Sequence, residues 1–310
     1  MTGVLLLNLG GPDSLDAVRP FLYNLFSDRD IIRLGPSFLQ KPIAAVIAAT
    51  RAGKTRAMYS LIGGKSPILD ITAAQAAELE KMLNAGSKRY RVYTGMRYWH
   101  PLIEDAVSQI ERDGIKNIIA LGLYPHYSIA TTGSSFRELK KVIKRYHDIK
   151  LRFIGSWYAH PLYIEAMIER IREGLALFGA EPDVLFSAHS LPQKFIDDGD
   201  PYLNEIEGTI AAITKNLSLR WHLSFQSKSG PVKWLEPSTE HMIGELAKKG
   251  VKNLLVIPIS FVSDHIETLY EIDILYKDLA ARLGINLKRA ASLNTSPAFI
   301  RALAEIVKAS

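Results

Sequence analysis

The sequence contains no cysteine among its 310 residues. Disulfides, thiolate zinc sites, cysteine nucleophiles and cysteine-ligated iron–sulfur clusters are therefore all excluded within this chain. Any bound metal ion must be held by nitrogen and oxygen atoms. The segment after Gly10-Gly11-Pro12 lacks a dinucleotide fingerprint, and there is no Walker loop, no HExxH and no G-x-S-x-G elbow. These absences argue against nucleotide-dependent, zinc-protease and serine-hydrolase chemistry.

Long apolar runs are also absent. The longest, at 42–50, lies between Lys41 and Arg51 and falls far short of the roughly 18 residues that a membrane span requires. Residues 1–12 have no basic start and are typical of a strand and not of a signal peptide, so we expect a cytoplasmic protein. The net charge of +6 comes from interspersed acids and bases, which does not indicate nucleic-acid binding. It is compatible with a weak attraction to anionic lipid.

Short β-branched or leucine-rich runs alternate with helical patterns along the chain. With 47% of the residues apolar, the chain can bury a sizeable core. Eight strands alternating with helices predict an α/β fold with parallel sheets. The expected strands are 4–9, 91–95, 117–124, 151–156, 184–189, 221–226, 253–259 and 286–293.

An internal repeat divides the chain. Residues 97–101 and 114–119 align with 233–237 and 250–255 at one offset of 136, whereas 4–12 align with 184–192 at an offset of 180. The first half therefore carries about 44 additional residues between its first two strands. We predict two related domains, 1–156 and 157–310, with an insertion in the first at about 25–68.

The insertion contains an apolar cluster. Ile43, Val46 and Ile47 would share one face of a short helix over 42–50. Such a face packs inward, contacts a hydrophobic ligand or touches a membrane. The pattern does not distinguish a membrane from a protein partner, and an ordinary surface elaboration is the simpler alternative.

Residues that close strands are the candidates for chemistry, because ligands of open α/β sheets bind outside the carboxyl ends of the strands. His189 ends the run 184–189. A neutral imidazole there can accept a proton or ligate a first-row metal ion near neutral pH. On this evidence alone, a histidine hydrogen-bonded to the adjoining loop is the simpler interpretation.

Three carboxylates follow the run 253–259. In a helix, Asp264, Glu267 and Glu271 would share one face at i, i+3 and i+7. Like charges at this spacing cost roughly a few tenths of a kcal/mol per pair, which a row that handles cations would justify. The simpler alternative is a solvated acidic face with Asp264 near the helix N-terminus.

Aromatic and cationic residues follow other strands. Arg97, Tyr98, Tyr124 and Trp234 would together form a cleft walled by flat rings with a few fixed cations. Such a cleft suits a large planar acid, although residues of these types at a sheet edge are frequently plain core or rim.

Seven motifs, in the same order along the chain, resemble those of the ferrochelatase family. Each is weak alone, but their order makes the resemblance specific, and it covers essentially the whole chain. That family folds as two Rossmann-like α/β domains, each with a mainly parallel four-stranded sheet flanked by helices, in agreement with the repeat. The motifs are LNLGGP at 7–12, IGGKSPI at 62–68, RYWHP at 97–101, 124–135 with TGSS at its end, FSAHSLP at 186–192, QSKSGP at 226–231 and 263–273.

The resemblance implies a lyase that inserts Fe²⁺ into protoporphyrin IX, giving protohaem and two protons, in the last step of haem biosynthesis. Iron would be a substrate, with no cofactor and no iron–sulfur cluster. His189 and Glu267 would be catalytic, with His189 either accepting the pyrrole protons or ligating the iron. The metal would meet His189, Glu267, Asp264 and Glu271, and the inserted segment would form a hydrophobic lip. The porphyrin would contact Tyr59, Ser66, Arg51, Arg97, Tyr98, Tyr124, Trp234, Phe261 and His265.

Some positions depart from parts of the family. Leu9 stands where relatives that metallate coproporphyrin carry a tyrosine, which favours protoporphyrin. Thr50 stands where some relatives have a second arginine beside Arg51. We expect a member of the family without the cysteine-bearing C-terminal extension of its iron–sulfur members. The alternatives are a coproporphyrin, sirohydrochlorin or cobalt chelatase, or a non-catalytic porphyrin or haem carrier on the same fold.

Overall fold

The chain folds as two compact units. The computed structural model describes residues 1–86, 89–146, 148–228, 230 and 232–310. One unit comprises 1–156 with 303–310, and the other comprises 157–302. The sequence-based division also falls after residue 156, but it puts 303–310 in the second half. These residues belong to the first unit because helix α11 (Pro297–Lys308) begins in one unit and ends in the other.

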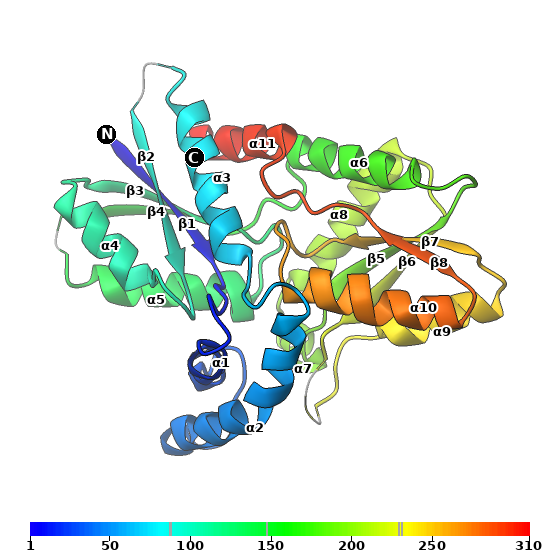
Figure 1. The fold of residues 1–310 in the computed structure, drawn as a ribbon. Coiled ribbons are helices and arrows are strands. Elements are labelled where there is room, and N and C mark those ends of the chain that lie inside the picture. The colour runs from blue at the N-terminus through cyan, green and yellow to red at the C-terminus, as the bar shows by residue number, and fades with distance from the viewer. Residues whose placement is uncertain (87–88, 147, 229, 231) are drawn as a thin grey trace. The chain divides into compact units, whose positions relative to one another are not determined.

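The first unit is built on a parallel sheet of four strands in the order β2-β1-β3-β4 (Figure 1). Helices connect the strands, as parallel pairing requires. The strands are β1 (Thr2–Asn8), β2 (Tyr90–Met96), β3 (Asn117–Gly122) and β4 (Lys150–Ile154). The helices after the insertion are α3 (Ile68–Leu83), α4 (Ile103–Arg112), the π-helix η2 (Ile129–Gly133) and α5 (Ser134–Ile143).

The second unit repeats this plan with the strand order β6-β5-β7-β8. The strands are β5 (Asp183–His189), β6 (Trp221–Gln226), β7 (Asn253–Pro258) and β8 (Asn286–Arg289). The helices are α6 (Pro161–Leu175), α7 (Gln193–Asp197), α8 (Tyr202–Asn216), α9 (Thr239–Lys248), the π-helix η3 (Glu267–Tyr276) and α10 (Lys277–Arg282).

The strand registers confirm the internal repeat. Gly3 pairs with Ile118 in the first sheet, as Asp183 pairs with Leu254 in the second. These pairs are related by the offsets of 180 and 136 found in the sequence. The predicted α/β fold with two parallel sheets is thus confirmed. The last strand is shorter than the predicted 286–293, because it ends at Arg289 and the chain then turns into a loop.

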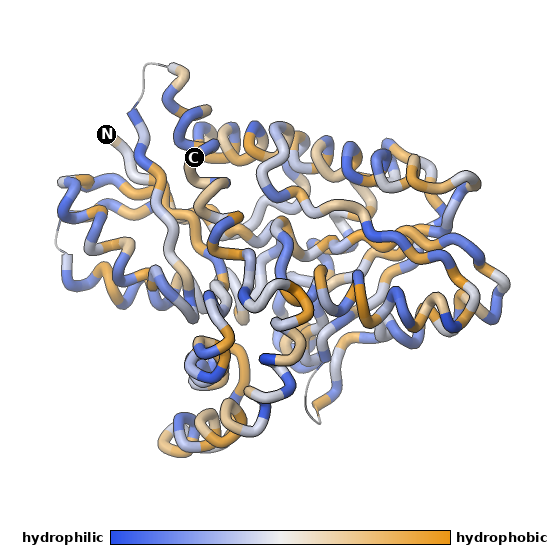
Figure 2. The backbone as a smooth tube through the Cα atoms, viewed as in Figure 1, coloured by the Kyte–Doolittle hydropathy of each residue, from blue (hydrophilic) through white to orange (hydrophobic). Residues whose placement is uncertain are grey.

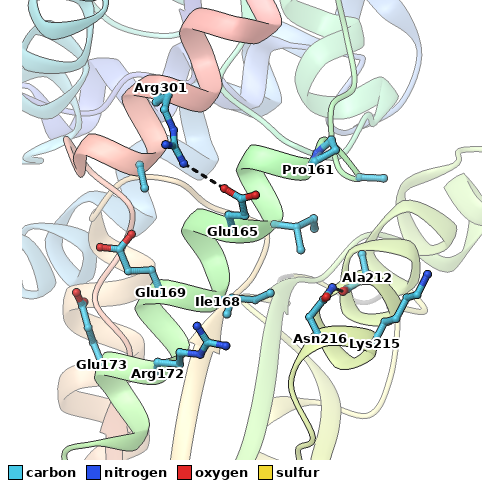
Figure 3. A pocket seen from close by; sticks show the side chains of 13 residues that line it. Pro161, Glu165, Ile168, Glu169, Arg172, Glu173, Ala212, Lys215, Asn216 and Arg301 are labelled. Carbon is cyan, nitrogen blue, oxygen red and sulfur yellow. Dashed lines mark hydrogen bonds and ion pairs between the residues drawn. The ribbon is translucent and has the colours of Figure 1, made fainter.

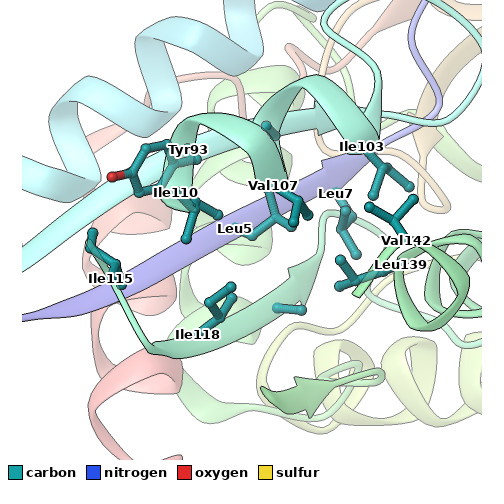
Figure 4. Close-up of a cluster of buried hydrophobic side chains, with 12 residues drawn as sticks. Leu5, Leu7, Tyr93, Ile103, Val107, Ile110, Ile115, Ile118, Leu139 and Val142 are labelled. Carbon is teal, nitrogen blue, oxygen red and sulfur yellow. The ribbon is translucent and has the colours of Figure 1, made fainter. Parts of the chain in front are cut away.

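The central strands β1, β3, β5 and β7 are apolar on both faces, because helices cover both sides of each sheet (Figure 2). Leu5 and Leu7 of β1 lie in a cluster with side chains of α4 and α5 (Figure 4). The alternate residues Val4 and Leu6 are fully buried on the opposite face. Helix α3 packs against β1 and β2 and contributes nothing to the cluster, so it covers that second face.

The segment between β1 and α3, which contains the predicted insertion at about 25–68, forms helix α1 (Val18–Ser27), the 3₁₀ turn η1 (Ser37–Leu39) and helix α2 (Gln40–Ser60). The predicted short helix at 42–50 is therefore part of a helix of 21 residues. Small residues on one stripe of α2, Ala44, Ala48 and Ala52, are buried where α1 packs against it. Val46 is 64% exposed and Phe38 75% exposed. Within the described residues, no helix is both long enough and apolar enough to cross a membrane.

The core of the second unit leads to a stability prediction. Leu185 is fully buried among side chains of α9, η3 and α10. The substitution Leu185→Ala should lower the free energy of unfolding by about 2–5 kcal/mol, because it leaves a cavity that the packed helices close only partly. Leu177→Ala, at a leucine that is 53% exposed, should cost less than about 0.5 kcal/mol. Denaturant unfolding measures both, and equal losses would contradict the assigned core.

Candidate functional site

A histidine and a glutamate meet at the carboxyl edge of the second sheet. His189 is the last residue of the central strand β5, and Glu267 is the first residue of η3. His189 Nδ1 lies 2.8 Å from Glu267 Oε2. The His189 side chain keeps 34% of its surface exposed, whereas that of Glu267 keeps 16%. The pair therefore has an accessible imidazole supported by a buried carboxylate.

A serine hydroxyl extends this pair to a second glutamate. Ser227 Oγ donates to Glu267 Oε2 at 2.8 Å and to Glu271 Oε2 at 2.6 Å, the two bonds being alternatives for one proton. Gln226 Nε2 also donates to Glu271 Oε2, at 3.0 Å. Ser227 has a φ of 67°, in the left-handed region that non-glycine residues rarely adopt. The polar contacts therefore hold this residue in a strained conformation next to the site.

The three ionisable groups of this cluster have shifted pKa values. Burial alone would lower the pKa of His189, but the Glu267 charge beside it raises the pKa above its usual value. Burial opposes ionisation of Glu267, yet His189 and Ser227 lower its pKa to about 2. Burial and the charge of Glu267 raise the pKa of Glu271 to about 7. Near neutral pH, Glu267 is therefore ionised, and Glu271 titrates close to this range.

The ring nitrogens of His189 are therefore distinguishable. With Glu267 accepting from Nδ1, the lone pair of a neutral imidazole lies on Nε2. The backbone also fixes the ring: Ser260 Oγ accepts from the amide of His189 at 2.9 Å, and Tyr202 donates to its carbonyl at 2.9 Å. Nε2 is thus oriented to receive a proton or a metal ion.

Two further predicted residues lie beside this pair. Phe261 contacts His265 edge-on at a ring separation of 4.1 Å and His189 at 6.0 Å. His265 is buried, and its Nδ1 donates to the carbonyl of Ser263 at 3.0 Å. Its Nε2 has no hydrogen-bond partner in the described part of the chain, and burial lowers its pKa.

Asp264 lies away from the glutamates. It precedes η3 and pairs with Arg289, whose Nη1 lies 2.9 Å from Asp264 Oδ1. Ser292 and Asn294 also donate to its carboxylate. The predicted shared face therefore holds Glu267 and Glu271 but not Asp264, because Asp264 lies in the turn before the helix and not within it.

Trp234 lies at a separate small cavity of the same unit. The cavity has a volume of about 310 Å³, and its lining includes Phe225, Leu235 and Lys233. Trp234 pairs with Pro192 in an isolated antiparallel bridge, which ties its segment to the residues that follow His189. Its ring nitrogen is buried without a partner among the described residues.

In the first unit, one buried aspartate accepts hydrogen bonds from three side chains that lie in segments after β2 and β3. Asp28, at the end of α1, is 7% exposed. Its Oδ2 accepts from Arg97 Nη2 at 2.8 Å, from Tyr98 OH at 2.6 Å and from Ser134 Oγ at 2.5 Å. Burial opposes its ionisation, but these donors lower its pKa. The root of the insertion is thereby attached to the edge of the first sheet.

The other predicted residues of the first unit differ in accessibility. Tyr59, Ser66 and Tyr124 are buried, and the hydroxyl of Tyr124 has no partner among the described residues. Ser66 lies so close to Gly11 that a Cβ added there would come within 2.5 Å of its side chain. Arg51 is exposed on α2, with its guanidinium 5.3 Å from the ring centroid of Phe26.

The comparisons with known proteins show the family of the chain. The family model described as Ferrochelatase matches residues 1–310. The chain belongs to the ferrochelatase family. It is 56% identical over 312 residues to a ferrochelatase of Geobacter metallireducens, covering 99% of this chain and 98% of the relative. It is 52% identical over 308 residues to a ferrochelatase of Desulfotalea psychrophila, covering 99% and 96%.

Solved structures of other proteins have a similar fold. SirB from Bacillus subtilis with Fe³⁺ is similar at a TM-score of 0.58 and 12% identity, with 99% of this chain and 94% of SirB covered. CbiX, described as the terminal enzyme of sirohaem biosynthesis in denitrifying bacteria, is similar at a TM-score of 0.55 and 13% identity, with 99% of each chain covered. At this level of identity the likeness shows the chelatase fold.

The sequence did not single out three residues of the candidate site. Gln226 and Ser227 were quoted only within a motif, although they close β6 in the way that His189 closes β5. Applying the strand-end rule to β6 would have found them. Asp28 carried no such signal, because its partners are distant in sequence. Of the motif at 226–231, Ser229 and Pro231 lie outside the described residues.

A cavity of the second unit is separate from these residues. It has a volume of about 820 Å³ and lies along α6 and α8, with none of the predicted site residues in its lining. Figure 3 shows its charged side chains, including the ion pair between Glu165 and Arg301 at 3.1 Å. Within the described segments, no group of three histidine, aspartate or glutamate side chains is arranged to hold a metal ion.

The raised pKa of Glu271 leads to a pH prediction. Because its folded pKa of about 7 exceeds the ordinary 4.5, wild-type stability falls as pH rises between these values. Glu271→Gln removes this loss. The stability of the variant relative to the wild type should therefore increase from pH 5 to pH 8, as measured by urea unfolding at both pH values.

A second variant comes from the other glutamate. Glu267→Gln removes the charge that raises the pKa values of Glu271 and His189. Its stability relative to the wild type should therefore also increase from pH 5 to pH 8, because both groups then bind protons less tightly in the folded state. A pH-independent difference for Glu271→Gln would contradict the assigned pKa.

Proposed function

We propose that this protein is a lyase that inserts Fe²⁺ into protoporphyrin IX to give protohaem and two protons, the last step of haem biosynthesis. The observation that carries the proposal is the His189–Glu267 pair, with Glu271 joined to it through Ser227, in a chain that belongs to the ferrochelatase family. Iron is a substrate in this proposal, and no cofactor or iron–sulfur cluster takes part. We propose that the enzyme works in the cytoplasm.

The reaction releases two protons, and the cluster offers two groups to receive them. His189 presents Nε2 while Glu267 stabilises the imidazolium that forms. Glu271 can take up the second proton because its pKa lies close to neutral. Histidine nitrogen and carboxylate oxygens bind Fe²⁺ without the strong retention of a thiolate cage. His189, Glu267 and Glu271 are therefore suited to bind Fe²⁺ transiently and to release it to the porphyrin.

The porphyrin requires a different set of side chains. We propose that Arg97 binds a propionate, since Asp28 and Ser134 hold its Nη2 and Nε and leave Nη1 directed elsewhere. Arg51 and Ser66 offer further donors. The aromatic side chains supply apolar surface, and binding energy from remote parts of the ring can support its distortion. The contacts proposed on this basis are Tyr59, Tyr124, Trp234, Phe261 and His265. Tyr98, which is almost fully buried, acts instead through its hydrogen bond to Asp28, the partner of Arg97.

The proposed catalytic roles are tested by metal insertion. Under anaerobic conditions with Fe²⁺ and protoporphyrin IX, His189→Ala and Glu267→Gln should each lower kcat by roughly 100-fold or more, because proton transfer loses its positioned base. His222→Ala is a matched control, since His222 pairs with Asp183 at the opposite end of the second sheet.

The absorbance change of the porphyrin measures insertion. Wild-type rates for both site variants would contradict the assignment. Binding of porphyrin without any insertion by the wild type would favour a carrier. Faster insertion into coproporphyrin III than into protoporphyrin IX would favour the alternative chelatase.

We further propose that the insertion touches a membrane surface through the 42–50 segment and the turn before it. Phe38 and Val46 expose large apolar side chains on neighbouring elements. The net charge of +6 adds an attraction to anionic lipid. Protoporphyrin is apolar over most of its ring, so a protein surface in contact with lipid would meet its substrate there.

Flotation with vesicles of phosphatidylglycerol and phosphatidylcholine tests this contact. The wild type should float, and the double variant Phe38→Ser, Val46→Ser should lose most of its bound fraction because two exposed apolar anchors are removed. Leu177→Ser, at an exposed leucine of the second unit, should bind as the wild type does. Ile43 and Ile47 are half-buried and are left unchanged. Equal flotation of all three proteins would refute the contact.

A further inference from the structure

Helix η3, which carries Glu267 and Glu271, is a π-helix of ten residues. π-helical segments are rare, mostly span a single turn and frequently lie at functional sites. An uninterrupted π-helix of this length therefore requires support from the surrounding structure. Its Ile272 and Tyr276 are buried in the apolar cluster of the second unit, which supports one side only.

The other side is held by one arginine from the end of β8. Arg289 is 11% exposed and binds Asp273, within η3, through two parallel hydrogen bonds. Its Nε lies 2.9 Å from Asp273 Oδ1, and its Nη2 lies 2.8 Å from Asp273 Oδ2. Its Nη1 lies 2.9 Å from Asp264 Oδ1, in the turn that precedes η3. One guanidinium thus joins two points that are separated by most of the helix.

Asp264 is fully engaged in this contact. Its carboxylate accepts from Arg289, Ser292, Asn294 and Thr268. Four donors are about as many as the lone pairs of a carboxylate accommodate. The Asp264 amide also donates to Asn294 Oδ1 at 2.9 Å. Binding a metal ion through Asp264 would require breaking several of these bonds, so its geometry fits a structural anchor.

Arg289 is equally occupied. Besides the two aspartates, its Nη1 lies 3.3 Å from the carbonyl of Ala290 and from Ser292 Oγ. All three nitrogens of the guanidinium thus have acceptors within the chain. The planar, two-sided arrangement is one that lysine does not reproduce, because an ammonium is a single point donor.

We infer that Arg289 is a positioning residue: by anchoring Asp264 and Asp273, it fixes η3 and so places Glu267 and Glu271 against His189 and Ser227. The effect on metal insertion rests on the proposed function, whereas the effect on the helix does not. Asp264, one of the predicted metal residues, acts here as one of the two anchors.

Three variants test this inference. Asp273→Asn keeps the shape of the side chain but weakens one anchor, and Arg289→Lys keeps the charge but joins only one anchor. Asp183→Asn is the matched control, because Asp183 is a carboxylate with 16% exposure that pairs with His222 at the other end of the same sheet. None of these residues belongs to the proposed catalytic set.

Hydrogen exchange followed by mass spectrometry reports on the helix without reference to activity. In Asp273→Asn and Arg289→Lys, peptides covering 264–276 should exchange about 10-fold faster or more, while peptides of β5 and β7 stay protected, since a local anchor governs local opening. In Asp183→Asn the 264–276 peptides should exchange as in the wild type. Unchanged exchange there in both anchor variants, or an equal increase throughout the unit, would overturn the inference.

Kinetics then separate positioning from general destabilisation. The anchor variants should lower kcat for metal insertion about 10-fold, with KM for porphyrin within about twofold of the wild type, because the glutamates are displaced while the porphyrin contacts remain. Asp183→Asn should change neither constant by more than about twofold. Faster exchange of the helix with unchanged kcat would refute the link to Glu267 and Glu271. A wild type that inserts no metal would refute the proposed function, while the exchange result would still decide the anchoring.

Discussion

The hydrogen bond between His189 and Glu267 is the contact around which the polar cluster of the second unit is arranged. A carboxylate as buried as that of Glu267 is costly to ionise without partners. Its partners come from two different elements, the end of β5 and the residues after β6. Ser227 meets this demand with a backbone conformation that is unfavourable for its residue type. The hydrogen bonds of the cluster therefore hold Ser227 in a backbone conformation that serine rarely adopts. Strained residues of this kind are concentrated at functional sites.

Much of the fold could be predicted from the sequence, because the repeat and the apolar runs report directly on buried parallel strands. The position of His189 and the i, i+4 relation of Glu267 and Glu271 also follow from local sequence. Asp264 illustrates the limit. Its spacing suggests a third member of the row, but its side chain bonds to Arg289 and to the loop after β8, and such distant pairing leaves no periodic signal.

Asp28 shows the same limit in the first unit. Three donors from two later segments of the chain converge on one oxygen of this residue. Sequence reasoning found Arg97 and Tyr98 as candidates for contacts with a ligand. Tyr98 is almost fully buried, and its hydroxyl is committed to Asp28 and Ser134. Tyr98 therefore helps to hold the Arg97 guanidinium in place, because both side chains bind the carboxylate of Asp28. The members of such a buried polar network stabilise one another.

Helix α11 has a consequence for the order in which the chain acquires structure during its synthesis. The first unit includes residues 303–310, of which Leu303, Ala304, Ile306 and Val307 are buried. A ribosome makes these residues after the whole of the second unit. The first unit therefore cannot complete its buried surface as it emerges, although its sheet is synthesised first. Its folding is completed only after residues 303–310 have been synthesised.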